Sequence, residues 1–438
     1  MVLVVTEISK YILALFMVMY GFSCFNVFRY HTEEDRKFIY FRQNLYMLII
    51  YTISFFLLII RYKEAKYLVY YCITLLSLIS IILFYRIFYR KTNKLIVNNM
   101  CMLLSIGFII LCRLSFDKAI RQFAIAMFSV AVTLLIPFII SKGPFFSRFS
   151  WIYASIGIVA LLVVLLFSVT TFGAKINISI LGITFQPSEF VKIIFVFAIA
   201  GFLTKNKHFK GVVISAVVAA AHILILVASK DLGGAIIFFV VYLTMLYVAT
   251  CNVIYSLLGI TAGCFASVIG YKLFPHVRTR VTAFSDPLGT VSNAGYQISQ
   301  SLFAIGTGGM FGMGFGAGAP KKIPVVTSDF VFSAICEEFG VFFGVGLILI
   351  CISCFVMFLN IAMRFNNAFY KYVAVGLSIL YGFQVFLTIG GVVKFIPLTG
   401  VTLPLVSYGG TSVLVTLVLF SIIQGLYISV RNGVEHDY

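Results

Sequence analysis

Long apolar stretches alternate with short polar joints along almost the whole chain. Most of these stretches are about as long as the ~20 residues that a helix needs to cross a bilayer. Their apolar residues follow one another continuously, whereas a membrane-spanning strand would alternate them with polar residues. The pattern therefore predicts an all-α polytopic membrane protein. We expect spans at residues 10–28, 44–61, 67–88, 98–113, 119–141, 151–172, 187–204, 211–228, 232–250, 253–274, 329–361, 371–393 and 404–430.

A basic joint at residues 86–94 (RIFYRKTNK) separates the first three spans from the other ten. We expect an amino-terminal three-span extension at 1–97, a ten-span core at 98–430 and a short tail at 431–438. The longest polar interruption of the core is the segment 275–328, which is rich in glycine and carries several charges. Because loops carry sites while spans carry packing, this segment is expected to be functional.

Composition agrees with the span pattern. The 438 residues are 62% hydrophobic and only 11% charged, whereas soluble domains are roughly a quarter charged. The formal net charge of +18 does not require a nucleic-acid partner, because Lys and Arg commonly flank spans beside anionic headgroups. We therefore expect a membrane-embedded protein that binds no nucleic acid.

The basic residues also predict an orientation. With the long loop set aside, one set of interhelical loops, including residues 29–42, 86–94 and 205–210, holds more Lys and Arg than the opposite set. The richer set is expected in the cytoplasm. This places the 275–328 loop and the amino terminus outside the cell and the carboxyl terminus inside. The first apolar run has no convincing cleavage site and is interpreted as a retained span.

Several small motifs are interpreted as structural. Cys351 and Cys354 form a CxxC within an expected span, where two small apolar side chains are the better interpretation. The histidines show no metal-ligand spacing, so no zinc site is read. The glycine run 306–318 contains a loose GxGxxA but has no strand before it, so we predict tight turns or close helix packing and no nucleotide or redox cofactor.

Asp286 is the sharpest catalytic candidate among the fourteen acidic residues. It stands before a proline in the long loop, where helical backbone is disfavoured. Arg278 and Arg280 come a few residues earlier. The residue could be a general base, an Asx-type turn initiator or an arginine partner, and the sequence leaves these open.

Two other motifs place carboxylates at the start of spans. Pro187 suits the first position of a helix, and Glu189 and Lys192 then share one face and can pair. A charged pair at the mouth of a span is costly unless it lines a cavity, so the pair is either structural or functional. Asp231 and Asp329 each open a span and are interpreted as helix caps.

The last candidates lie deeper in the core. Glu337 and Glu338 come about two turns inside the span that Asp329 opens. At that depth a pair of glutamates requires an aqueous or basic cavity, and it is either structural or ligand-facing. The stretch 397–412 has two prolines and a glycine pair at a span entrance. We expect it to be non-helical and to line the same cavity as the long loop.

Taken in order, these motifs resemble the SEDS family (shape, elongation, division and sporulation), which includes FtsW, RodA and SpoVE. The resemblance covers roughly residues 98–430 and rests on Gln186-Pro-Ser-Glu-Phe-Val-Lys192, Asp231-Leu-Gly-Gly, Asp286-Pro, Gly295-Tyr-Gln-Ile-Ser-Gln-Ser301, Ala304-Ile-Gly-Thr-Gly-Gly309, Asp329-Phe-Val-Phe-Ser, Glu337-Glu-Phe-Gly340, Pro397-Leu-Thr-Gly-Val-Thr-Leu-Pro404 and Ser407-Tyr-Gly-Gly. The chain departs from the family at Asn177, where a tryptophan is frequent, and at Val325, where a glutamate is frequent. These departures concern donor or acceptor contacts.

The resemblance implies a peptidoglycan glycosyltransferase that polymerises lipid II, an undecaprenyl-pyrophosphate-linked disaccharide–peptide. It implies action on the outer face of the bacterial plasma membrane in elongation, division or sporulation, with a class B penicillin-binding protein as crosslinking partner. The family's catalytic aspartate falls on Asp286, and its cavity carboxylate and lysine fall on Glu189 and Lys192. Further substrate-binding or cavity residues are expected at Gln186, Arg278, Arg280, Lys322, Asp329, Glu338 and Ser407.

The chemistry agrees with this assignment. An acceptor hydroxyl must lose a proton as it attacks the anomeric carbon, which requires one general base. A pyrophosphate leaves readily and needs positive charge, from Arg278, Arg280, Lys321 or Lys322, or from a divalent cation such as Mg²⁺ or Mn²⁺. Two alternatives are a flippase for the lipid-linked precursor and a non-catalytic scaffold for the penicillin-binding protein.

Overall fold

The structure is a computed structural model that describes residues 2–30, 32–141, 144–171, 174–180, 183–205 and 209–433. In chain order its elements are α1 (Val2–Arg29), α2 (Glu33–Tyr62), α3 (Ala65–Phe88), α4 (Lys94–Leu114), α5 (Phe116–Thr133), α6 (Ile136–Ser141), η1 (Pro144–Phe149), α7 (Ser150–Phe167), β1 (Val169–Thr171), β2 (Ala174–Ile180), β3 (Ile183–Phe185), α8 (Pro187–Lys205), α9 (Phe209–Ala228), α10 (Leu232–Thr250), α11 (Val253–Leu273), α12 (Pro275–Ser285), α13 (Tyr296–Gly308), η2 (Pro320–Lys322), α14 (Val331–Phe339), α15 (Val341–Ala362), α16 (Ala368–Val392) and α17 (Gly410–Arg431).

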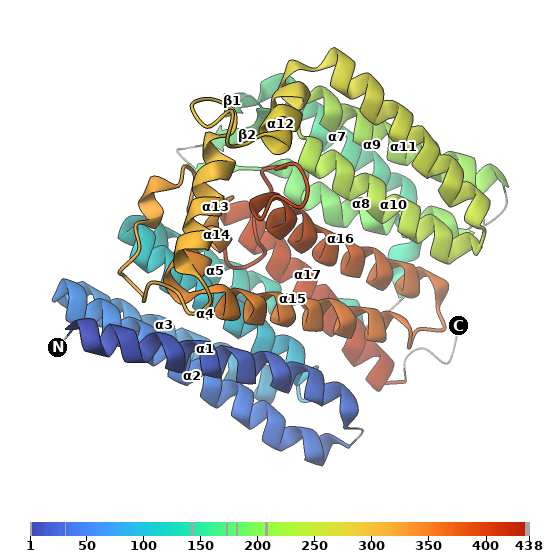
Figure 1. Cartoon of the computed structure of the whole chain (residues 1–438). Coiled ribbons are helices and arrows are strands. Elements are labelled where there is room, and N and C mark those ends of the chain that lie inside the picture. Colours follow the sequence, from blue (N-terminus) through green and yellow to red (C-terminus); the bar gives the residue numbers. More distant parts are fainter. Residues whose placement is uncertain are drawn as a thin grey trace.

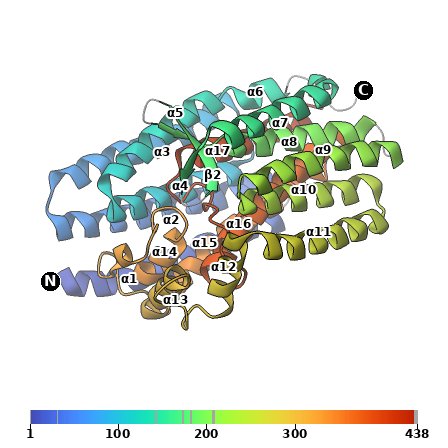
Figure 2. The same cartoon turned by 90° about the horizontal axis from the view of Figure 1, so that it is seen from above.

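Within these residues, thirteen helical segments are long and apolar enough to cross a membrane. This confirms the expected all-α polytopic fold. The long helices form one bundle, and the start of α1 and the end of α17 lie at opposite ends of it (Figures 1 and 2).

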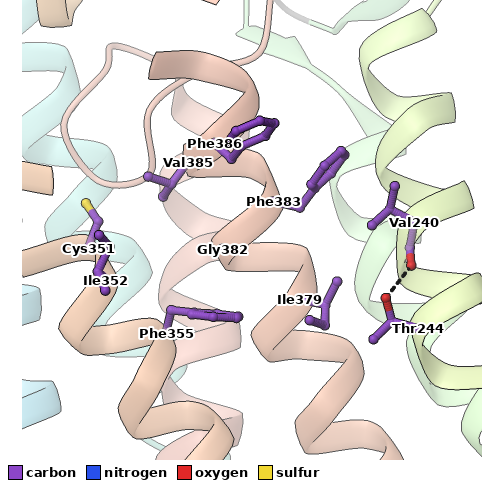
Figure 3. Close-up of a pocket in the computed structure, with 10 residues that line it drawn as sticks. All are labelled: Val240, Thr244, Cys351, Ile352, Phe355, Ile379, Gly382, Phe383, Val385 and Phe386. Atoms are coloured by element: carbon purple, nitrogen blue, oxygen red, sulfur yellow. Dashed lines mark hydrogen bonds between the residues drawn. The ribbon is translucent and has the colours of Figure 1, made fainter. Parts of the chain in front are cut away.

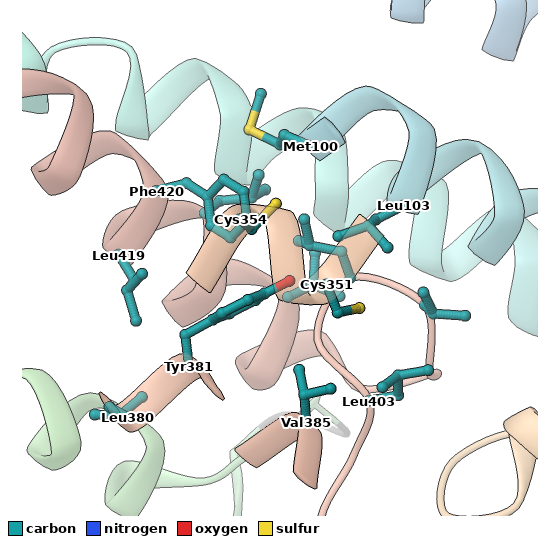
Figure 4. Close-up of a cluster of buried hydrophobic side chains, with 14 of the residues drawn as sticks. Met100, Leu103, Cys351, Cys354, Leu380, Tyr381, Val385, Leu403, Leu419 and Phe420 are labelled. Carbon is teal, nitrogen blue, oxygen red and sulfur yellow. The ribbon is translucent and has the colours of Figure 1, made fainter. Parts of the chain in front are cut away.

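The centre of the bundle is built from the helices that are buried most completely. All of the most apolar window of α4 is buried, as is 78% of the corresponding windows of α8, α16 and α17. In Figure 4, helices α4, α15, α16 and α17 meet around Tyr381, whose ring centroid lies 5.5 Å from that of Phe420. Cys351 and Cys354 are buried in the same cluster, as predicted for apolar packing. In contrast, α11 has no buried residue and contacts chiefly α10 and α12.

The amino-terminal extension, α1–α3, packs on α4 and α15 and is held there by buried polar side chains. The Tyr20 hydroxyl donates to Asn99 Oδ1 at 3.1 Å, and Asn99 Nδ2 donates to Ser353 Oγ at 2.7 Å. Asn98 Nδ2 donates to Gln43 Oε1 at 2.9 Å. Hydrogen bonds between membrane helices contribute about 0.6 kcal/mol each on average. The extension is therefore an integral part of the bundle.

We expected residues 329–361 to form one continuous span, and this prediction is wrong. The chain breaks at Gly340, whose φ is +86°, so that the short α14 precedes the membrane helix α15. A Cβ at this position would lie 2.4 Å from the carbonyl oxygen of Met310. Only glycine tolerates both this backbone conformation and this close approach. Because the residues on either side of Gly340 are apolar, hydropathy did not predict the break.

Two further boundaries differ from expectation. The span 119–141 is divided into α5 and α6, because Pro137 lacks the N–H that would continue the helical hydrogen bonds. The span 151–172 ends at Phe167 and is followed by a three-stranded antiparallel sheet, β1–β2–β3, which was not predicted. The expected loop 275–328 is also partly helical, since it contains α12, α13 and η2.

Candidate active site

Glu189 and Lys192 form a buried ion pair in the first two turns of α8. Their side chains are 9% and 3% exposed, and Lys192 Nζ lies 2.6 Å from Glu189 Oε1. Lys192 Nζ also donates to Gln384 Oε1 of α16 at 3.4 Å. The predicted pairing is therefore confirmed, and so is Pro187 as the first helical residue.

Gln384 connects this ion pair to the non-helical loop that precedes α17. Its Nε2 donates to the carbonyl oxygen of Thr402 at 3.1 Å. From the next turn of α16, Thr388 Oγ1 donates to the carbonyl oxygen of Val401 at 3.0 Å. Gln186 contacts the same region, since its backbone N–H donates to Thr411 Oγ1 at 3.2 Å. The expected non-helical stretch is confirmed for residues 397–409, whereas α17 begins at Gly410, six residues later than the expected span 404–430. The polar start of α8 holds this stretch.

Ser407 joins that loop to the turn before Asp329. Its Oγ donates to the carbonyl oxygen of Ser328 at 2.5 Å and accepts from Leu403 N–H at 3.0 Å. The residue is 2% exposed. Its contacts therefore hold two loops together, and its hydroxyl is already occupied by them.

The turn before Asp329 carries backbone strain. Val325 has a φ of +53°, a conformation that is a true outlier for a β-branched residue. Such strain is concentrated at functional sites, where the surrounding structure maintains it. Val325 is also one of the two positions at which the chain departs from the SEDS pattern.

Arg280 of α12 lies among backbone and carboxylate oxygens. Its Nη1 donates to the carbonyl oxygen of Thr399 at 3.3 Å. A Cβ on Gly400 would lie 3.6 Å from Asp329 Oδ2 and 4.0 Å from Arg280 Nη2, which places these two side chains around the same glycine. Asp231 caps α10 by accepting Gly234 N–H at 2.8 Å, as predicted. Asp329 was also expected to be a cap, but Phe330 occupies the N-cap position of α14 without a side-chain hydrogen bond, so that prediction is wrong.

The charges of Asp231, Arg280 and Asp329 influence one another. Burial raises the pKa of Asp231 and of Asp329, and the Arg280 guanidinium acts to lower both. Burial lowers the pKa of Arg280, and the two carboxylates act to raise it. The pKa of Asp231 also responds to the charges of Lys192 and Glu189. One electrostatic cluster therefore extends from the α8 ion pair to Arg280 and Asp329.

Asp286 lies at the end of α12 and is exposed to solvent. Its Oδ1 accepts from Gly289 N–H at 2.8 Å, and its carbonyl oxygen accepts from Thr290 Oγ1 at 2.6 Å. This confirms the Asx-type turn. Among the residues that the structure describes, Asp286 forms no ion pair with Arg278 or Arg280. The turn orients the carboxylate without neutralising it.

The remaining candidates lie elsewhere. Glu338 pairs with Arg113 of α4, with 2.9 Å between Arg113 Nη2 and Glu338 Oε1, and so belongs to a different set of contacts. Arg278, Lys321 and Lys322 are exposed. In the described part of the chain, no three His, Cys, Asp or Glu side chains lie together as a metal site would require.

Sequence reasoning missed Gln384 in this region and Arg113 in the separate contacts of Glu338. Neither was singled out, although a lone amide or guanidinium in or beside an apolar span is a recognisable signal. Thr399 was quoted within the motif 397–404, but the role of its carbonyl oxygen was not predicted. Their partners are distant in sequence, as in the pair formed by Lys192 and Gln384. Residue spacing could not reveal those contacts.

An apolar cavity of about 260 Å³ opens between α10, α15 and α16. Phe355, Phe383 and Phe386 line it, and Thr244 directs its hydroxyl to its own helix, donating to the carbonyl oxygen of Val240 at 2.8 Å (Figure 3). The lining therefore suits hydrocarbon.

Solved structures share this fold. A chain from a structure titled "Structural coordination of polymerization and crosslinking by a peptidoglycan synthase complex" aligns with a TM-score of 0.65 at 22% identity. That alignment covers 77% of this chain and 98% of the other. The Thermus thermophilus rod shape determining protein RodA aligns with a TM-score of 0.57 at 22% identity, covering 77% and 97% of the two chains.

Sequence relatives match over the same region. The peptidoglycan glycosyltransferase RodA of Mycobacterium tuberculosis is 30% identical over 367 residues, which are 77% of this chain and 78% of the relative. The probable peptidoglycan glycosyltransferase FtsW of a Geobacter species is 33% identical over 278 residues, covering 60% and 74%. The family model described as "Cell cycle protein", which unites FtsW, RodA and SpoVE, matches residues 93–432. The chain therefore belongs to the FtsW/RodA/SpoVE family of cell cycle proteins.

Proposed function

We propose that this chain is a peptidoglycan glycosyltransferase that polymerises lipid II into glycan strands on the outer face of the plasma membrane. Its family and the names of its relatives support the reaction. The observation that supports the proposal most strongly is the placement of a cation and a carboxylate on α12. This one short helix carries Arg280, which lies beside Gly400 together with Asp329, and it ends at the exposed Asp286. A cation and a general base therefore come from a single element.

In the proposed reaction, an acceptor sugar hydroxyl attacks the anomeric carbon of the donor. The new carbon–oxygen bond forms as the bond to the pyrophosphate breaks, and the pyrophosphate leaves with the bonding electrons. The hydroxyl proton passes to the Asp286 carboxylate, which acts as general base. The hydrogen bond from Gly289 N–H fixes the orientation of that carboxylate.

Positive charge must stabilise the departing pyrophosphate, and this role is assigned to Arg280, which lies on the helix that ends at Asp286. Arg278, Lys321 and Lys322 are exposed and free to approach a phosphate. A divalent ion is a further part of the proposal. Mg²⁺ is usually held by one or two carboxylates together with substrate phosphates, and it would supply further positive charge for the departing pyrophosphate. The activated leaving group makes a nucleotide or redox cofactor unnecessary.

The ion pair of Glu189 and Lys192 is assigned a positioning role. Through Gln384 it holds Thr402 and so fixes the loop whose Thr399 carbonyl binds Arg280. The apolar cavity between α10, α15 and α16 is assigned to the prenyl tail of the substrate, because its lining is almost wholly hydrocarbon.

We also propose a class B penicillin-binding protein as the crosslinking partner. One structural neighbour is described as part of a complex that coordinates polymerization and crosslinking. The positive-inside pattern supports placing α12 and the amino terminus on the extracytoplasmic side and the carboxyl terminus in the cytoplasm.

The test is polymerisation of lipid II by the purified protein with its partner. Asp286→Asn keeps an oxygen that accepts from Gly289 N–H, whereas Asp286→Ala removes both the base and the turn contact. We expect both variants to lose at least ~100-fold in rate, as the removal of a general base predicts. Parallel reactions with Mg²⁺, Mn²⁺ or EDTA test the divalent ion.

The two alternatives predict different results in this assay. A flippase would retain lipid II transport in Asp286→Asn, and wild-type protein would form no glycan. A scaffold would bind its partner without turnover. An Asp286→Asn protein that polymerised at the wild-type rate would refute the assignment of the base.

A further inference from the structure

The amino-terminal extension reaches the glycine-rich loop, defined here as residues 309–319. A Cβ on Gly314 would lie 2.6 Å from Thr6 Cγ2 of α1. A Cβ on Gly316 would lie 2.9 Å from Arg61 Cδ of α2. Both glycines have positive φ. The loop therefore packs closely against α1 and α2. Both helices lie outside residues 93–432, the range that matches the family.

Arg113 of α4 connects the extension to this loop through its guanidinium. Nε donates to Glu338 Oε1 at 3.0 Å, and Nη2 donates to the carbonyl oxygens of Gly316 at 3.3 Å and Gly318 at 3.1 Å. Nη1 donates to the Tyr62 hydroxyl at 3.1 Å. Tyr62 is the last residue of α2 and, among these partners, the one that the extension supplies.

The side chains of Arg113 and Glu338 are 8% and 0% exposed. Each N–H of such a guanidinium needs an acceptor, and a side chain with so little exposure has little access to water as a substitute. Without the Tyr62 hydroxyl, Nη1 loses its described acceptor. The guanidinium is then expected to rotate towards another acceptor and to weaken its contacts with the two glycine carbonyls.

The glycine-rich loop leads directly to the candidate active site. Ala319 N–H donates to Glu337 Oε1 at 2.8 Å, and η2 and a tight turn then carry the chain to Asp329. The turn is fixed from the other side by Ser407, which donates to the carbonyl oxygen of Ser328. Tyr408 N–H also donates to the carbonyl oxygen of Thr327 at 2.8 Å, and Lys118 Nζ donates to Thr327 Oγ1 at 2.9 Å. The position of Asp329 therefore depends on these contacts at its near side and on the Arg113 cluster at the other end of the segment.

We propose that Tyr62 is a positioning residue. It holds the Arg113 guanidinium against the glycine-rich loop, and through this contact the three amino-terminal spans set the position of the segment that ends at Asp329. The effect on turnover rests on the proposed glycosyltransferase function, whereas the effect on the loop does not.

The experiment compares Tyr62→Phe with Tyr71→Phe in the full-length protein. Both changes remove one tyrosine hydroxyl from the extension, but Tyr71 bonds Thr52 within the extension itself. Hydrogen–deuterium exchange is followed at the amides of residues 311–329, and lipid II polymerisation is measured with the partner present. A third variant, Glu338→Gln, removes the ion pair with Arg113 and shows how fast the loop exchanges without it.

We expect Tyr62→Phe to speed exchange in 311–329 and to lower kcat roughly three- to tenfold, the effect of one lost hydrogen bond, with KM for lipid II nearly unchanged. Tyr71→Phe should match the wild type in both measurements. Glu338→Gln should speed exchange in residues 311–329 more than Tyr62→Phe does.

Two results would overturn the inference. One is exchange in Tyr62→Phe that matches Tyr71→Phe, and the other is faster exchange with unchanged kcat in an active enzyme. If the wild type itself forms no glycan, the proposed function fails, and the exchange data alone decide whether Tyr62 holds the loop.

Discussion

At the scale of single residues, the acidic side chains of the core differ in what surrounds them. Asp286 is exposed and oriented by a backbone N–H, which leaves its charge available to a substrate. Glu189 and Glu338 are buried and neutralised by Lys192 and Arg113. The first arrangement suits proton transfer and the other two suit the holding of loops. Sequence alone could weigh these roles but could not assign them, because the neutralising partner of Glu338 is remote in the chain.

The ion pair in α8 gives a prediction at this scale. Glu189→Gln or Lys192→Met alone leaves a buried charge without its partner, which costs about 3–5 kcal/mol. We expect each single variant to lower the thermal midpoint in detergent strongly. The double variant Glu189→Gln/Lys192→Met should lose less than the sum, since both charges are gone.

The exposed pair of Glu34 and Lys37 serves as the control. Its atoms are 3.9 Å apart and its side chains are 89% and 65% exposed. Glu34→Gln should therefore leave the midpoint unchanged. Additive losses in the α8 double variant would show that Glu189 and Lys192 act independently.

At the scale of elements, hydropathy predicted the number and approximate position of the spans but not where they break. Residues 329–361 are apolar on both sides of Gly340, so nothing in their hydropathy distinguishes α14 from α15. The sheet had a readable signal, because residues 175–180 (KINISI) alternate polar and apolar side chains. That signal was overlooked between two long helices.

The glycines of the long loop provide an element-scale prediction. Gly312 has a φ of +83°, and a Cβ there would lie 2.3 Å from the carbonyl oxygen of Glu338. Gly312→Ala should therefore displace the loop from α14 and reduce the yield of folded protein. Gly306 lies in α13 with nothing within 4 Å of an added Cβ. Gly306→Ala should be neutral or stabilise the protein by about 0.5–1 kcal/mol.

Thermal midpoints and size-exclusion profiles of both alanine variants measure this difference. Equal tolerance of alanine at 306 and at 312 would mean that the loop does not need the tight approach seen beside α14.

At the scale of the whole molecule, the start of α1 and the end of α17 lie at opposite ends of the bundle (Figure 1). An odd number of spans, thirteen in the described residues, requires this arrangement. The fold alone does not say which end faces the cytoplasm. That orientation rests on the distribution of Lys and Arg, and the proposed chemistry depends on it.

Labelling in intact cells tests the orientation. Ser285→Cys precedes Asp286, and Asn432→Cys follows α17 at the opposite end; both positions are exposed. We expect a membrane-impermeant maleimide to label Ser285→Cys and to spare Asn432→Cys until the cells are opened. Wild-type protein provides the background from native cysteines. Labelling of Asn432→Cys alone in intact cells would place α12 in the cytosol, where it could not act on the growing wall.

The polar contacts between the extension and the core impose an order on biogenesis. As the chain emerges from the ribosome, Tyr20 and Gln43 enter the bilayer before Asn98 and Asn99 exist to receive them, and Ser353 arrives last. Until then these side chains must form hydrogen bonds with water or with a temporary partner, such as an insertion chaperone. A chain trimmed to the range shared with relatives would lose the Gln43 partner of Asn98 and the Tyr20 partner of Asn99, while Asn99 would keep Ser353. Such a trimmed chain should be recognised and degraded by membrane quality control.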